Sequence, residues 1–148
     1  MRKAGLLLLS IVIFSCNLEK HTIHRAQKHR DRLMQIAAGL IEQHKNDTAN
    51  EIFLGAEGTL DRATARFLQR KVKTIWVHII YGPAKGFIDT DSVIIFTRNG
   101  IPLLGMQHNI LIDYKTVPRN QFNSCGSCTK ALRIGERMFY LAAPMPPF

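Results

Sequence analysis

Three runs of β-branched and aromatic residues in the second half of the chain constrain the fold most strongly. They cover residues 74–81, 92–98 and 109–117, and turn-forming residues separate them. In the last run apolar residues alternate with others, so that Ile110 and Ile112 share one side. These patterns predict β-strands, and the alternation predicts one buried face.

The connections between these strands carry turn signals as well. Asn99-Gly100 lies between two apolar runs, and this dipeptide strongly predicts a tight hairpin. The returning strand, residues 101–106, contains Pro102, which cannot donate a ladder hydrogen bond and therefore suits an edge or an irregular start. A last strand is expected at residues 137–143, before a group of prolines.

Two amphipathic helices are expected ahead of the strands. The first covers residues 23–45, with apolar residues at helical spacing in its second half and first turns that are too polar to be packed. The second covers residues 60–71 and follows Thr59, which can cap its first turn. Residues 51–54, between the helices, fit either a strand or a helical turn.

Together these elements predict an α+β fold. We expect the two N-terminal helices to pack on one face of an antiparallel sheet of about five strands. The length suits one domain, which we place at residues 33–148.

The first sixteen residues have the layout of an export signal. Arg2 and Lys3 precede an apolar run over residues 4–14, and Ser15 then precedes Cys16. The apolar run is too short to span a bilayer, which needs about 20 residues. We therefore expect residues 1–15 to be a signal peptide that is removed.

Ile13-Phe14-Ser15-Cys16 resembles the lipobox of bacterial lipoproteins. The resemblance implies cleavage after Ser15, diacylglycerol on the Cys16 thiol and an acyl chain such as palmitate on the new amino group. Asn17 stands where inner-membrane lipoproteins commonly have Asp, which implies the outer membrane, facing the periplasm. The alternative is an ordinary secreted protein, but Ile13 fits a general signal peptidase site poorly.

A basic segment follows the expected lipid anchor. Its cations are Lys20, Arg25, Lys28, Arg30 and Arg32. We expect residues 16–32 to form a lipidated, basic tether that either contacts anionic headgroups or serves as a soluble spacer. Nucleic acid is not expected as a partner, because an exported, membrane-anchored protein meets lipid and envelope proteins first.

Cys125 and Cys128 are separated by two residues in a polar stretch. Such a pair can form a disulfide, half of a metal site or a thiol-disulfide exchange centre. A second cysteine pair is missing from the sequence, and a predicted strand separates His108 from this one, which disfavours a metal. The short distance to the last strand leaves no room for a thioredoxin-like helix, so a loop-closing disulfide is favoured.

Other candidate groups have ordinary structural interpretations. His78 lies in the densest apolar strand, and Asp89 and Asp91 belong to a turn before a strand. We therefore predict no catalytic residue, no metal site and no cofactor.

These patterns favour a non-enzymatic binding or scaffolding protein, anchored by lipid in the bacterial cell envelope and acting on another envelope protein. Three alternatives remain open. The chain could be a periplasmic thiol-disulfide redox protein that uses Cys125 and Cys128, an immunity or inhibitor lipoprotein, or a binder of small molecules between sheet and helices.

Overall fold

The computed structural model describes residues 18–47, 49–55, 59–74, 76–81, 93–98, 106–115, 117 and 129–144. Residues 18–28 are helical. The elements that follow are α2 (Arg30–His44), β1 (Glu51–Gly55), α3 (Arg62–Phe67), the π-helical turn η1 (Leu68–Val72), β2 (Trp76–Ile80), β3 (Val93–Arg98), β4 (Met106–Asp113), β5 (Lys130–Arg133) and β6 (Met138–Pro144).

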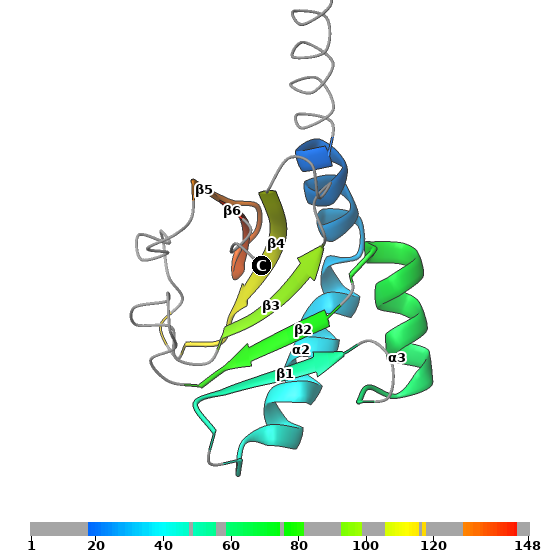
Figure 1. Cartoon of the computed structure of the whole chain (residues 1–148), viewed down its shortest axis with the longest axis vertical. Helices are drawn as coiled ribbons and strands as arrows, with labels where there is room; N and C mark the ends of the chain where they lie inside the picture. Colours follow the sequence, from blue (N-terminus) through cyan, green and yellow to red (C-terminus); the bar gives the residue numbers. More distant parts are fainter. Residues whose placement is uncertain are drawn as a thin grey trace, which may run out of the picture.

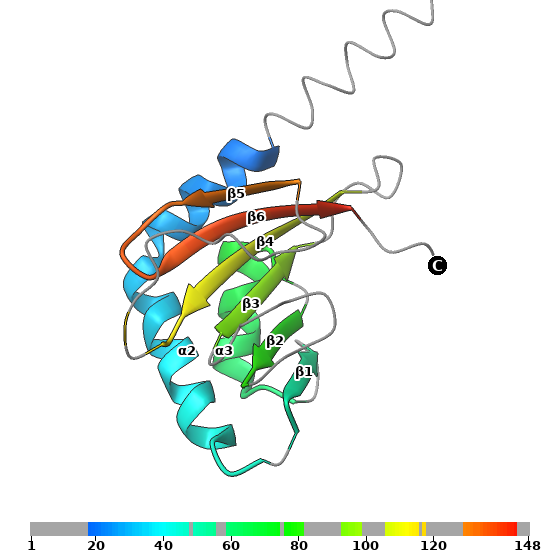
Figure 2. The same cartoon turned by 90° about the vertical axis from the view of Figure 1, so that its left-hand side faces the viewer.

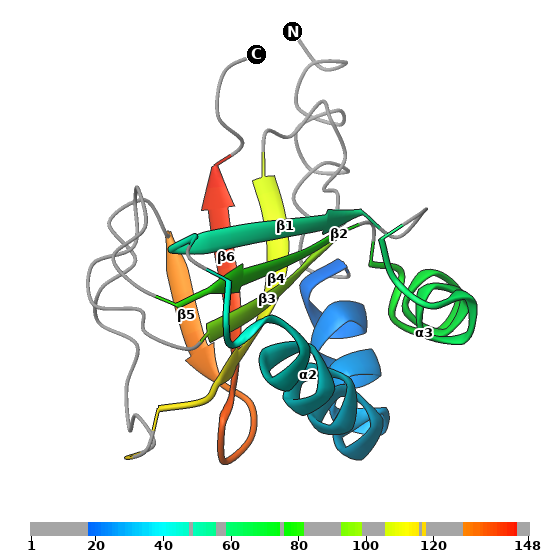
Figure 3. The same ribbon diagram turned by 90° about the horizontal axis from the view of Figure 1, so that it is seen from below.

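The strands form one six-stranded sheet with the order β1-β2-β3-β4-β6-β5, and all neighbours are antiparallel. Figures 1 and 2 show this order, with β1 at one edge and β5 at the other. Both α2 and α3 lie on the same side of the sheet (Figure 3). The predicted α+β fold is confirmed, and the ambiguous residues 51–54 belong to strand β1.

The core lies between the helices and one face of the sheet. Its helical side chains come from the apolar stripe of α2 and from η1, and its strand residues come from β1, β2, β4 and β6. Two tyrosines fasten α2 to the sheet. The Tyr81 hydroxyl donates to the Ile41 carbonyl at 3.3 Å, and the Tyr114 hydroxyl donates to the Met34 carbonyl at 2.6 Å.

Residues 99–105 lie outside the described residues, but the register of β3 and β4 contradicts a two-residue hairpin at Asn99-Gly100. Arg98 on β3 lies opposite His108 on β4, so a two-residue turn cannot join the paired residues. The register instead brings Ile94 opposite Ile112. Because a one-residue slip would move every side chain to the other face, the apolar pattern decides the pairing over the turn signal.

The prediction of a single buried face on the sheet is also wrong. On β4, Ile110 and Ile112 face the helices, yet Leu111 and Asp113 on the opposite face are fully buried. Ile80 and Phe139 share that opposite face and are buried as well. Alternation therefore located the strand correctly but not the environment of its second face.

The first helix starts earlier and packs more closely than expected. His29 donates its backbone N–H to Arg25 at 3.1 Å and accepts from Leu33 at 3.0 Å, so helical bonding runs through His29 into α2. We expected these first turns to stand clear of the domain, but Ala26 is fully buried and Thr22 is 2% exposed. Small side chains at these positions let the helix approach the sheet despite its charged neighbours.

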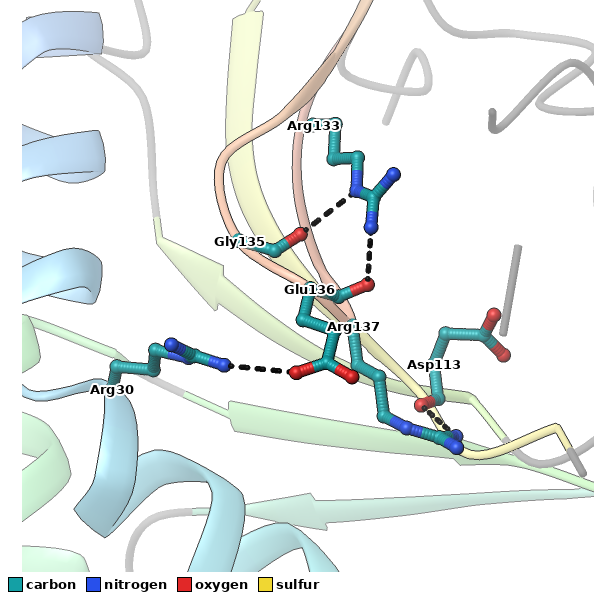
Figure 4. A network of polar contacts seen from close by, with 6 residues as sticks. All are labelled: Arg30, Asp113, Arg133, Gly135, Glu136 and Arg137. Carbon is teal, nitrogen blue, oxygen red and sulfur yellow. Dashed lines mark hydrogen bonds and ion pairs between the residues drawn. The ribbon is translucent and has the colours of Figure 1, made fainter. Parts of the chain in front are cut away.

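Ion pairs hold this part of the helix to the far edge of the sheet. Glu19 pairs with Lys130 on β5 at 2.7 Å, and Arg30 pairs with Glu136 at 3.6 Å. Figure 4 shows Glu136 in the turn between β5 and β6, where Arg133 donates to two turn carbonyls. The packed domain thus includes residues 18–32.

The second helix is capped by Asp61, not by Thr59 as predicted. The Asp61 carboxylate accepts from the backbone N–H groups of Ala63 at 3.0 Å and Thr64 at 2.9 Å. The Thr59 hydroxyl donates instead to the Gly55 carbonyl at 2.7 Å. The helix ends at Lys73, whose backbone is left-handed with φ 64°.

Candidate functional site

A row of exposed basic residues runs along the first helix. Lys20, His24, Lys28 and Arg32 follow one another at four-residue intervals, and all four are exposed. Residues four apart lie on the same side of a helix, with a small drift at each step. This row lies away from the buried stripe that includes Ala26 and packs on the sheet.

A second basic row lies on α3 and η1. Arg62, Arg66 and Arg70 are also four residues apart and exposed, and the buried Thr64 and Leu68 lie on the other side of the helix from Arg66. Residues 59–73 contain five Lys and Arg against one Asp. We call the two rows, together with the exposed Lys71 beside Arg70, the basic face: Lys20, His24, Lys28, Arg32, Arg62, Arg66, Arg70 and Lys71.

The two helices meet at His29 and Phe67, near cations from both rows. The two rings make an edge contact with centroids 5.4 Å apart and planes at 85°. Burial lowers the pKa of His29, and the charges of Lys28 and Lys71 lower it further. The imidazole is therefore neutral near pH 7, while Lys28 and Lys71 keep the positive charge on either side of it.

A groove of about 250 Å³ lies between α2 and the start of α3. Its polar walls include Arg32, Gln35 and Gln43 from α2 and Asp61 from the cap of α3. The hydrogen bonds from Thr64 lower the pKa of the Asp61 carboxyl, with a smaller contribution from the charge of Arg32. One carboxylate, that of Asp61, therefore lies among the cations of the basic face, beside Arg32.

Two of the five predicted headgroup ligands lie off this face. Arg30 points to the β5–β6 turn and pairs with Glu136 (Figure 4). Arg25 is half-buried, and its Nη1 atom is buried without a hydrogen-bond partner among the residues that the structure describes. The remaining three, Lys20, Lys28 and Arg32, belong to the basic face.

No protein-family model, curated protein or solved structure matches this chain. The chemistry of the site is therefore argued from its own residues.

The predicted covalent site residues lie outside the described residues. These are Cys16, Cys125 and Cys128. Asp89 and Asp91, which were expected in a turn, also lie outside the described residues. Within the described ranges, no cluster of three or more His, Cys, Asp or Glu side chains could hold a metal ion. In the same part of the chain, no helix has the length and apolar character needed to cross a membrane.

Two histidines in the sheet, His78 as predicted and His108 on β4, make structural contacts. His108 is buried, and its Nδ1 atom lies 2.5 Å from the hydroxyl of the buried Tyr140. His78 is 8% exposed and pairs with Glu51 at 3.0 Å. Both contacts satisfy buried polar groups, as expected for histidines inside a sheet.

The second basic row was not predicted, because its cations are spread through an amphipathic helix and do not form a continuous basic segment like the one after Cys16. The signal was present, since the four-residue spacing of Arg62, Arg66 and Arg70 can be read directly from the chain. The spacing of residues alone does not predict that this helix lies beside the first helix.

Proposed function

We propose that this chain is a lipid-anchored protein of the bacterial cell envelope whose domain rests on an anionic membrane through the basic face. The lipid is attached at Cys16, and the domain is a binding or scaffolding module for another envelope protein. In a cell with two membranes, the location is the outer membrane, on its periplasmic side.

The observation that carries this proposal is the basic face on the outer side of the helices. The first row begins at Lys20, four residues after Cys16. Four residues reach at most about 14 Å, so an anchor at Cys16 holds Lys20 close to the headgroups. Each Lys or Arg near an anionic surface contributes about 1 kcal/mol of binding.

This orientation of the basic face leaves the opposite face of the sheet available to a partner. With the helices against the membrane, the opposite face of the sheet points away from it, toward soluble or envelope partners. That face carries the exposed side chains of Phe53 and Trp76. A binding module is thus favoured over an enzyme, because the basic face contacts a surface rather than positioning a reactive group.

The anchor is tested by the intact mass of the protein purified from membranes, with and without reduction and alkylation. The proposal expects a mature chain that starts at Cys16 and carries acyl chains, with Cys125 and Cys128 reactive only after reduction. An unlipidated chain would overturn the anchor. Two freely reactive thiols would favour the redox alternative.

The basic face is tested separately by binding to vesicles of phosphatidylcholine with or without phosphatidylglycerol. Reversing Arg66 and Arg70 to Glu should weaken binding to the anionic vesicles at least about tenfold, since two favourable charges become unfavourable. The matched control reverses Lys45 and Arg133, which lie off the basic face, and should retain binding. Equal losses in both variants would show that only net charge matters.

A further inference from the structure

Strand β1 has an outer edge whose backbone groups point away from the sheet. The Tyr81 N–H donates to the Asn50 carbonyl at 2.8 Å, so in the antiparallel ladder Ile52 and Leu54 also bond to β2. Hydrogen-bonded and non-hydrogen-bonded pairs alternate along such a ladder. The N–H and C=O groups of Glu51, Phe53 and Gly55 therefore point outward.

The side chains at this edge are aromatic and exposed. Phe53 is 61% exposed, and its ring stacks on His78 with centroids 3.9 Å apart and planes at 18°. Trp76, opposite Gly55, is 39% exposed and lies on the same face of the sheet. An edge strand with exposed apolar side chains and outward backbone groups is a template for strand pairing.

Among the described residues, the opposite edge strand carries more charge than β1. Strand β5 has only four residues, and two of them are Lys130 and Arg133. Short length and cations both discourage pairing with another strand. On β1, Glu51 carries the single charge, and His78 already pairs with it.

We propose that β1 pairs with β1 of a second copy, antiparallel and centred on Phe53. A two-fold axis there places the two Phe53 residues opposite each other and each Glu51 opposite the Gly55 of the other copy. This register uses the outward backbone groups of Glu51, Phe53 and Gly55 on both strands, and it brings no like charges face to face. The Gly55 carbonyl oxygen can accept this additional hydrogen bond, because it has two lone pairs and the Thr59 hydroxyl uses only one of them.

The dyad of such a pair is perpendicular to the sheet. Rotation about it keeps the helices of both copies on the same side, so the dimer has one continuous sheet and two basic faces that point the same way. Two copies on one membrane can pair in this manner without lifting either basic face. This pairing goes beyond the proposed function, because it does not depend on what the lipid or the partner is.

The test is the mass of the full chain in detergent, measured by light scattering after size exclusion over a range of concentrations. We expect a dimer for the wild type and a monomer for Phe53→Asp, which would place two carboxylates opposite each other. Leu132→Asp is the matched control, because Leu132 is 37% exposed on the other edge strand. It should remain dimeric.

A second variant covers the case in which Phe53→Asp alters folding. Phe53→Cys should cross-link two chains through a disulfide between the two copies of residue 53, identified by peptide mass, whereas Leu132→Cys should not. A wild type that is monomeric at every concentration, a Phe53→Asp chain that stays dimeric, or equal cross-linking from both positions would overturn the proposal. None of these outcomes bears on whether Cys16 carries lipid.

Discussion

Tyr140 and His108 form a buried hydrogen-bonded pair within the sheet, with 2.5 Å between the hydroxyl and Nδ1. Burial raises the pKa of Tyr140 above its ordinary value, so the hydroxyl stays protonated. Replacing Tyr140 by Phe should lower the free energy of unfolding by about 1–2 kcal/mol, because a buried polar contact is lost. Urea unfolding monitored by circular dichroism measures this change.

Tyr81→Phe is the control for that substitution. The Tyr81 hydroxyl is half-buried and makes a longer hydrogen bond of 3.3 Å to Ile41. Its loss should lower the free energy of unfolding by less than about 1 kcal/mol. Equal effects of the two substitutions would contradict a special contribution from the buried pair.

His78 makes stability depend on pH. Burial lowers its pKa below the ordinary 6.5, and the pairing with Glu51 offsets only part of that effect. As the pH falls below about 6.5, the unfolded imidazole takes up a proton that the folded one resists, so the free energy of unfolding decreases. The contribution of the neutral His78 to the free energy of unfolding is thus fully present above about pH 6.5 and is lost on acidification.

His78→Gln should therefore flatten the fall in stability between about pH 7 and pH 5, as followed by urea unfolding at each pH. The pKa of His29 is also lowered, so part of the fall should remain. A profile that His78→Gln leaves unchanged would show that the buried imidazole is not responsible.

At the scale of elements, the first helix is part of the core from its second turn. Ala26 has no exposed surface, whereas His24, two residues earlier, is exposed. Ala26→Gln should lower the free energy of unfolding by about 2 kcal/mol or more, since a polar side chain is forced into a packed site. His24→Gln on the same helix should change it by less than about 0.5 kcal/mol.

Thermal and urea unfolding measure the stability of the Ala26→Gln and His24→Gln variants. The difference between them distinguishes a helix that belongs to the core from a loose tether. A tether would tolerate both substitutions equally well.

The second helix depends on the Asp61 cap. Asp61→Ala removes the acceptor for two backbone N–H groups and should lower the midpoint of urea unfolding. Asp61→Ser keeps a capping oxygen and should recover most of that loss in the same urea experiment. A Ser variant as unstable as the Ala variant would argue against capping.

At the scale of the whole molecule, the basic face and the two exposed aromatic side chains Phe53 and Trp76 lie on opposite sides of the sheet. The helices carry the basic face, and Trp76, the single tryptophan of the chain, lies on the far side of the sheet. On anionic vesicles, Trp76 fluorescence should stay accessible to aqueous acrylamide and insensitive to brominated lipid. Strong quenching by brominated lipid would place the sheet, not the helices, against the membrane.

Charge also makes the orientation sensitive to salt. At about 1 M salt the Debye length falls to about 3 Å, so contacts between the basic face and headgroups are screened while an acyl anchor is not.

Local pattern by itself determined the class of fold and part of the candidate site. Alternation and helical spacing predicted the helices, most of the strands and their antiparallel arrangement, because each element must bury one side. The cations Lys20, Lys28 and Arg32 were predicted as a surface because they lie in a cation-rich segment directly after Cys16. Spacing along the chain was sufficient for these features, since neighbouring residues alone create them.

Tertiary structure decided everything that depends on which segments meet. The register of β3 and β4 pairs Arg98 with His108 and not with Ile101, and Arg30 pairs with Glu136 instead of lying on the basic face. The burial of Ala26, the placement of the second basic row beside the first and the open edge at Phe53 likewise follow from packing. These features join residues far apart in sequence, and the free energy that selects such contacts has no local signature in the chain.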